Sequence, residues 1–260
     1  MRLARTVPTA LAVAVSLPAL GIAQYTPRWH VGDWWIVKTR MPSMSGHGWQ
    51  WQYERYDVLS VEKVDGRDCF VLLEKYGDTT SVCAGVRTLY YVRTDDFRVA
   101  RRVEYYRQAG RLIGPVTTDY GQGMLGTLPG ALLPLFPLDD AGVPDSTFRY
   151  FKPQSADLRQ FTGQADSASL RGCLDDPGPS YGHPVPLRGG RVFSVLSEMG
   201  APGEAGRPKV PDTYTLQLWS EDYPWCIYGE WGQYKPRGGG VRSSSVRNWL
   251  IACGSSGSGP

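Results

Sequence analysis

Short runs of β-branched and aromatic residues follow one another along residues 29–113, and only a few turn-forming residues separate each run from the next. Trp49, Trp51 and Tyr53 alternate with polar residues, which is the two-residue period of a strand with one buried face. Connections this short join antiparallel strands, because a parallel pair needs a crossover of a dozen or more residues. The sequence therefore predicts a mainly β fold in which an antiparallel meander forms a curved sheet or an open barrel.

Residues 115–212 differ from this pattern, because they hold most of the prolines and show no sustained period. Within them, residues 124–138 are strongly apolar but contain three prolines, which excludes one regular helix. We expect a Pro/Gly-rich irregular insertion with short helical turns, in which residues 192–199 form a strand or a short helix. Alternation returns at residues 214–219, and a hairpin follows over residues 225–253.

The N-terminus has the layout of a secretory signal. Arg2 and Arg5 precede an apolar run over residues 7–20, and small residues stand at positions 21 and 23. We expect a signal peptide over residues 1–23 and a periplasmic or extracellular protein. No integral membrane span is expected after cleavage. A single β-rich domain over residues 24–253 and a flexible tail over residues 254–260 complete the predicted organisation.

The charge balance argues against nucleic acid as a partner. The chain has 28 basic and 25 acidic residues, and loss of the two arginines of the signal leaves 26 basic residues. Phosphate binding needs a concentrated basic face, which a balance so close to neutral does not indicate.

Five cysteines in an exported chain suggest disulfides. Folding the second hairpin at the glycine run 238–240 places Cys226 opposite Cys253, so these two form the first candidate pair. Cys69 and Cys83 flank the turn sequence Gly77-Asp78 and form a second candidate pair, three positions out of register. Buried free thiols are the alternative. Cys173 is not assigned, and no C-x-x-C motif indicates a metal.

Catalytic motifs are scarce. The three histidines lack metal-ligand spacing, and no G-x-S-x-G sequence is present. Carboxylates occur as four adjacent pairs: Asp95-Asp96, Asp139-Asp140, Asp175-Asp176 and Glu221-Asp222. Adjacent aspartates beside glycine or proline, as in Asp175-Asp176-Pro177-Gly178, are typical of turns. We therefore predict no catalytic residue, metal or cofactor, and favour a non-catalytic protein. A glycoside hydrolase that joins two distant carboxylates is the least favoured alternative.

Aromatic residues are in surplus, with nine tryptophans and fifteen tyrosines. Aromatic rings on a curved sheet can hold an apolar ligand, exposed rings can stack on sugars, and buried rings simply fill a core. The candidate ligand-binding residues are Trp34, Trp35, Trp49, Trp51, Met124, Leu132 and Phe136.

Three segments show the spacing of strands and tight turns along residues 29–113: W-x-V-G-D-W-W from Trp29, the turn Val64-Asp65-Gly66-Arg67 and the strand FRVARRVEYY. Together with the signal, they resemble uncharacterised secreted bacterial β-rich proteins, which are similar in pattern to the open half-barrels of the LolA and LolB lipoprotein carriers. The resemblance covers about residues 29–113 and 214–253 and transfers no functional residue. It implies a curved sheet with an apolar concave face and residues 124–138 as a lid or plug.

These observations leave two principal functions open. The first is an exported non-catalytic β protein that binds an apolar, lipid-like small molecule on the concave face. The alternative is an extracellular surface-interaction or carbohydrate-binding module that contacts a surface polysaccharide through exposed tryptophan and tyrosine.

Overall fold

The computed structural model describes residues 27–43, 45–76, 85–95, 97–124, 147–149, 157–164, 170, 173–174, 182–200, 212–234 and 242–256. The predicted signal peptide, Cys83, Leu132 and Phe136 lie outside these residues. The described strands are β1 (Asp33–Pro42), β2 (Trp49–Val64), β3 (Arg67–Tyr76), β4 (Arg87–Arg93), β5 (Val99–Gln108), β6 (Arg111–Met124), β7 (Thr147–Arg149), β8 (Asp157–Gln164), β9 (Val192–Gly200), β10 (Thr213–Ser220), β11 (Cys226–Tyr234) and β12 (Arg242–Ser255).

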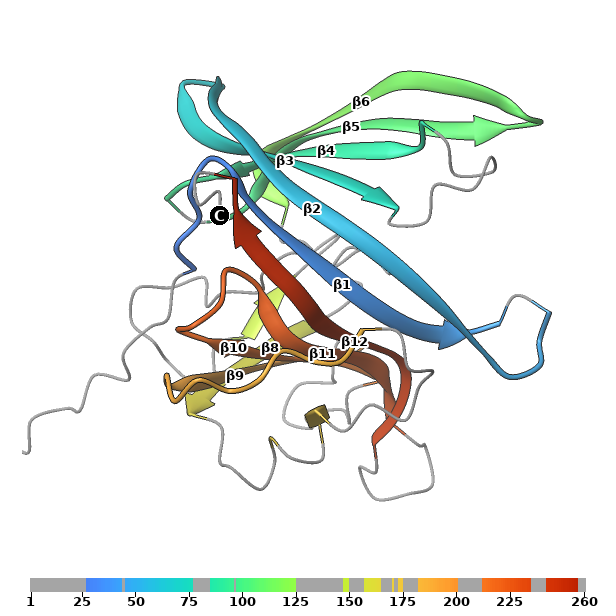
Figure 1. The fold of residues 1–260 in the computed structure, drawn as a ribbon, viewed down its shortest axis with the longest axis vertical. Coiled ribbons are helices and arrows are strands. Elements are labelled where there is room, and N and C mark those ends of the chain that lie inside the picture. The colour runs from blue at the N-terminus through green and yellow to red at the C-terminus, as the bar shows by residue number, and fades with distance from the viewer. Residues whose placement is uncertain are drawn as a thin grey trace, which may run out of the picture.

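These strands form one sheet in the order β6-β5-β4-β3-β2-β1-β12-β11-β10-β9-β8-β7. Each half is an antiparallel meander, and the pairing of β1 with β12 joins the two halves. Figure 1 shows β1, β2 and β12 running side by side through the middle of the molecule. Strands β6 and β7 end the sheet and do not pair with each other, so the sheet is open. The prediction of a mainly β fold with an open, antiparallel sheet is confirmed.

Two hairpins follow from their turn residues. Asp65 and Gly66 connect β2 to β3, and Ala109 and Gly110 connect β5 to β6. All four residues have positive φ angles. Two-residue loops with positive φ at both positions match the right-handed twist of the paired strands, and glycine adopts this conformation without strain.

The two faces of the sheet carry different residues in β2. Glu54, Tyr56 and Val58 are buried on the face that also carries Trp35, which we call the inner face. The residues that alternate with these along β2 lie on the opposite, outer face: Trp51, Tyr53, Arg55 and Asp57. The register of β2 with β3 shifts between Val58 and Ser60, which marks a β-bulge in β2.

An aromatic cluster forms the centre of the core on the inner face. Trp35 stacks on Trp225 with ring centroids 4.9 Å apart, and Tyr56 stacks on Trp225 at 5.1 Å. Trp29, which precedes β1, adds a ring 5.3 Å from Trp35. Trp35 and Trp225 are completely buried. Their packing joins β1, β2 and the β10–β11 turn, so this cluster holds the two meanders together.

The predicted disulfide between Cys226 and Cys253 is not formed, and both cysteines are free thiols. The reason is the register of the second hairpin. The predicted pairing of Cys226 with Cys253 would place Tyr228 opposite Ile251, whereas Tyr228 lies opposite Trp249, two residues away. The shift is already present beside the turn, where Tyr234 lies opposite Arg242, and the bulge between Trp231 and Gly232 reduces it from three residues to two. Cys253 instead lies opposite Trp35 on β1.

Cys69 is also a free, buried thiol. The register predicted around Gly77-Asp78 is wrong, because Leu72 lies opposite Tyr90 rather than Cys83. The segment between β3 and β4 is therefore longer than a two-residue turn, and Cys69 lies opposite Arg93 at the far end of the pair.

The region without a sequence period contains more strand than the pattern indicates. Strand β6 continues to Met124, and β7, β8 and β9 extend the second half of the sheet. Of the two alternatives expected for residues 192–199, a strand or a short helix, the strand is present as β9. Gly254 and Ser255, expected in the flexible tail, instead belong to β12, where Ser255 lies opposite Asp33.

Candidate ligand-binding pocket

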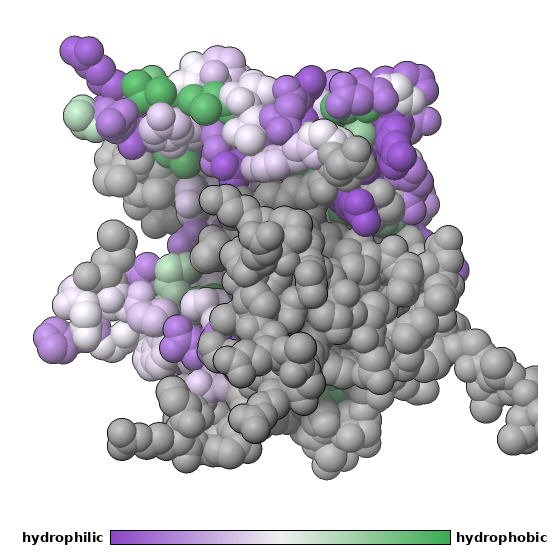
Figure 2. Space-filling model, turned by 180° about the vertical axis from the view of Figure 1, so that it is seen from behind, coloured by the Kyte–Doolittle hydropathy of each residue, from purple (hydrophilic) through white to green (hydrophobic). Residues whose placement is uncertain are grey.

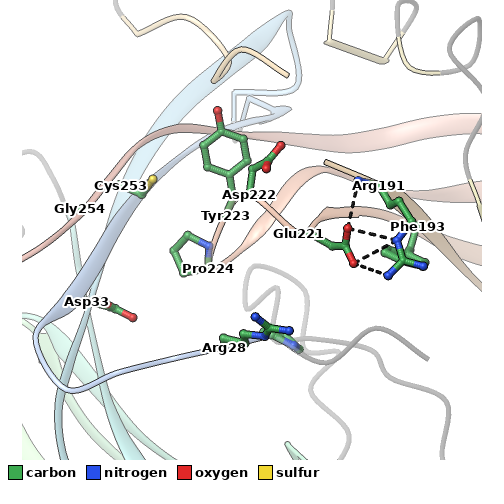
Figure 3. Close-up of a pocket in the computed structure, with 11 residues that line it drawn as sticks. Arg28, Asp33, Arg191, Phe193, Glu221, Asp222, Tyr223, Pro224, Cys253 and Gly254 are labelled. Carbon is green, nitrogen blue, oxygen red and sulfur yellow. Dashed lines mark hydrogen bonds and ion pairs between the residues drawn. The ribbon is translucent and has the colours of Figure 1, made fainter. Parts of the chain in front are cut away.

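A pocket of about 780 Å³ lies where the start of β1, the end of β12 and the β10–β11 turn meet. Figure 3 shows its lining side chains on three sides of an open space. Its volume is in the range of small-molecule sites. The lining residues are Pro27, Arg28, Asp33, Arg191, Phe193, Glu221, Asp222, Tyr223, Pro224, Cys253 and Gly254.

One wall is the segment that leads into β1. The indole N–H of Trp29 donates a hydrogen bond to the carbonyl oxygen of Pro224 at 2.6 Å. Gly32 has a φ of +96°, and a Cβ there would lie 2.6 Å from the Ser256 hydroxyl. Only glycine fits this close approach, in which the amide N–H of Ser256 donates to the Gly32 carbonyl. These contacts fix Arg28 and Asp33 at the pocket.

The opposite wall is the β10–β11 turn packed against the entry to β9. The Arg191 guanidinium donates to the Glu221 carboxylate, with its shortest contact at 2.6 Å. Asp222 accepts a hydrogen bond from the amide N–H of Gly190 at 3.0 Å. The buried Tyr223 donates its hydroxyl hydrogen to the Pro186 carbonyl oxygen. The polar groups of this wall are therefore held in place by the protein before any ligand binds.

The charged side chains of the pocket differ in how many hydrogen-bond and ion-pair partners they have. The ion pair with Arg191 lowers the pKa of Glu221, which keeps that carboxylate ionised. Asp33 accepts a hydrogen bond from the amide N–H of His30 at 2.7 Å. Arg28 makes no hydrogen bond within the described residues. Burial raises the pKa of the Cys253 thiol, so this thiol stays protonated at neutral pH.

A separate polar cluster is buried on the inner face of β2, β3 and β4. The Tyr56 hydroxyl lies 2.9 Å from a Glu74 oxygen and 3.4 Å from a Glu54 oxygen. The Tyr90 hydroxyl donates to the other Glu74 oxygen at 2.8 Å. Burial is the largest cause of a raised pKa for both carboxyl groups, and Glu54 is raised well above its ordinary value. The inner face is therefore not uniformly apolar.

The predicted ligand-binding tryptophans divide between the two faces. Trp35 is fully buried in the core cluster. Trp34, Trp49 and Trp51 lie on the outer face, where each ring has a cation above it: Arg55 at 4.7 Å, Arg40 at 4.5 Å and Lys38 at 4.5 Å, respectively. Met124 ends β6 opposite Val99. None of these residues lines the pocket.

Sequence reasoning missed most of the pocket, because its lining comes from four segments that are distant in the sequence. Two local signals were available. The turn before Asp33 belongs to the W-x-V-G-D-W-W sequence, and Glu221-Asp222 is one of the adjacent carboxylate pairs. Neither signal shows that the two segments meet.

The described residues contain no group of three or more potential metal ligands from histidine, cysteine, aspartate and glutamate. Among the same residues, no helix has the length and apolar character needed to cross a membrane. No family model, curated protein or solved structure matches the chain.

Proposed function

We propose that the protein binds a small polyhydroxylated ligand, a saccharide or a close analogue, in the pocket at the start of β1. The observation that carries this proposal is the combination of pre-positioned carboxylates and guanidinium groups with two aromatic rings around one space of about 780 Å³. Hydroxyl groups can donate to the free lone pairs of these carboxylates and accept from Arg28. The half-buried Phe193 can contact the apolar face of a sugar, whereas Tyr223 is 4% exposed and forms part of the pocket wall.

The described residues give less support to the apolar ligand. The inner face buries Glu54 and Asn248 beside its aromatic rings, and those rings already pack on one another. Seen from behind, the coloured part of the molecule shows hydrophilic residues interspersed with separate hydrophobic ones (Figure 2). A lipid-like ligand held by residues 124–138 stays a prediction, since residues 125–138 lie outside the described part of the chain.

The proposal assigns binding rather than hydrolysis to this pocket. A glycosidase needs one carboxyl group with a raised pKa as its acid. The pKa of Glu221 is instead lowered by Arg191. Asp33 and Asp222 each accept a hydrogen bond from a backbone N–H, which fixes the position of these side chains.

Tryptophan fluorescence provides the test, because Trp29 and Trp225 pack next to the pocket wall. The purified protein is titrated with glucose, galactose, N-acetylglucosamine and maltose, and with laurate as the apolar comparator. We expect saturable binding of at least one saccharide, weakened about tenfold by Arg28→Gln through loss of charge-assisted hydrogen bonds. The control Arg107→Gln, at the β5–β6 hairpin, should leave the affinity unchanged. Binding of laurate alone, or saccharide binding insensitive to Arg28→Gln, would overturn the proposal.

A further inference from the structure

Three cations lie directly opposite one another on the outer face of adjacent strands. Arg55 on β2 pairs in register with Lys75 on β3, and Lys75 pairs with Arg87 on β4. Directly opposed residues lie on the same face with their Cβ atoms about 5 Å apart. We call Arg55, Lys75 and Arg87 the cationic row.

Among the described residues, one carboxylate, that of Asp57, contacts this row. Asp57 contacts Arg55 at 2.8 Å and Lys75 at 3.0 Å, so a single negative charge serves two cations. The Arg55 and Lys75 side chains keep 36% and 45% of their surface exposed, and Arg87 is exposed as well. The two ion pairs with Asp57 offset part of the repulsion between these directly opposed like charges, and the three cations with one contacting carboxylate keep a net positive charge among the described residues.

Aromatic rings lie under both ends of the row. The Arg55 guanidinium lies 4.7 Å from the ring centroid of Trp34, and that of Arg87 lies 4.4 Å from Tyr105. The Arg55 guanidinium donates through Nε and Nη2 to Asp57, whereas Arg87 makes no hydrogen bond or ion pair within the described residues, so its N–H groups can donate to carboxylate or sulfate oxygens. Further along β2, Trp49 is 50% exposed beside Arg40.

We propose that the cationic row binds an anionic polysaccharide, a polymer with one carboxylate or sulfate per repeating unit. Charge complementarity supplies the attraction, and the flanking rings suit the faces of sugar units. Nucleic acid fits less well, because it needs an extended basic face, whereas this row is three residues wide in a chain with a net charge of +3. The proposal concerns a surface that shares no residue with the pocket and does not depend on it.

The test compares two variants with the same change of charge. In the row variant, Lys75→Gln and Arg87→Gln remove two cations. In the control variant, Lys63→Gln and Arg67→Gln remove two exposed cations at the β2–β3 hairpin. Binding to immobilised polygalacturonate is measured by biolayer interferometry at low and at physiological ionic strength, with dextran and double-stranded DNA as further probes. Circular dichroism and the Tm verify that both variants fold.

We expect the full chain to bind polygalacturonate but not dextran, with weaker binding as salt rises. The row variant should bind about tenfold more weakly, the control variant within about twofold of the unsubstituted protein, and Arg28→Gln unchanged. An equal loss in both double variants would show a net-charge effect and refute the row as a site. Binding to DNA as strong as to polygalacturonate, or no binding at low ionic strength, would refute it as well.

Discussion

Replacing Glu54 with glutamine should remove a pH-dependent loss of stability that the buried carboxyl pair imposes on the fold. Glu74 accepts two short hydrogen bonds from tyrosine hydroxyls, at 2.9 and 2.8 Å. Glu54 is 2% exposed and accepts one from Gln52 at 2.8 Å, with the Tyr56 hydroxyl farther away at 3.4 Å. The negative charge is therefore better stabilised on Glu74, and the retained proton belongs on Glu54.

The sign of the effect follows from the raised pKa of Glu54. In the unfolded chain this carboxyl group loses its proton near its ordinary value of 4.5, whereas the folded protein retains the proton to higher pH. The free energy of unfolding therefore falls as pH rises above that value, by about 1.4 kcal/mol per pH unit for one retained proton. The fall ends where Glu54 ionises within the folded protein.

Glu54→Gln mimics the protonated, neutral side chain and cannot lose a proton. We expect similar stability for the variant and the unsubstituted protein near pH 4. At higher pH the variant should become the more stable protein. If Glu54 of the folded unsubstituted protein keeps its proton to two pH units above the ordinary value of 4.5, the difference in free energy of unfolding reaches about 3 kcal/mol.

Glu74→Gln is the matched control. It places an amide N–H₂ group against one of the two tyrosine hydroxyls that donate to Glu74, so we expect it to cost about 1–2 kcal/mol even near pH 5. The assay is urea unfolding followed by circular dichroism at a series of pH values, plotted as variant minus unsubstituted protein so that other titrating groups cancel. A flat difference curve for Glu54→Gln between pH 5 and 8 would refute the reasoning.

Three further predictions concern the region around the pocket. Trp29→Phe should lower the free energy of unfolding by about 1 kcal/mol more than Trp225→Phe in urea unfolding. Of these two tryptophans, Trp29 has an acceptor for its indole N–H among the described residues and Trp225 has none; equal losses would contradict this. Iodoacetamide should label the half-buried Cys253 of the native protein before the buried Cys226, as read by peptide mass spectrometry, and a bridged pair that resists labelling until reduction would contradict the free thiols. Gly32→Ala should cost about 1–3 kcal/mol in the same unfolding assay, because its φ of +96° and the nearby Ser256 hydroxyl leave no room for a Cβ; an unchanged midpoint would contradict that fit.

Two turns of the first meander could be predicted from the sequence because their signal is local. Asp65-Gly66 and Ala109-Gly110 connect successive strands through two residues with positive φ, and such loops restrict the residues that can occupy them. The register of β12 could not be predicted in the same way. It depends on the pairing of Tyr234 with Arg242 beside the turn and on bulges against β1 and β11, and the glycine run between β11 and β12 does not specify either.

The alternation of Trp49, Trp51 and Tyr53 identified β2 as a strand but not which face is the core. Both faces of this strand contact other residues, and the inner face carries Glu54, which a pattern based on hydropathy assigns to solvent. The carboxyl group is tolerated there because Gln52 and Tyr56 supply hydrogen bonds from neighbouring side chains. A sequence pattern does not reveal this arrangement, because Glu74, which shares the Tyr56 hydroxyl, comes from β3 through cross-strand pairing.

The pairing of β1 with β12 gives the pocket its structure. This pairing places Asp33 opposite Ser255 and Trp35 opposite Cys253, so it positions one side of the pocket. The hydrogen bond from Trp29 to Pro224 then joins the segment before β1 to the turn that carries Glu221 and Asp222. Because the same contacts connect the two meanders, changes that loosen them should reduce stability and pocket binding together. Arg28→Gln should reduce binding alone, since Arg28 makes no hydrogen bond within the described residues. This difference separates a residue that contacts the ligand from residues that hold the pocket open.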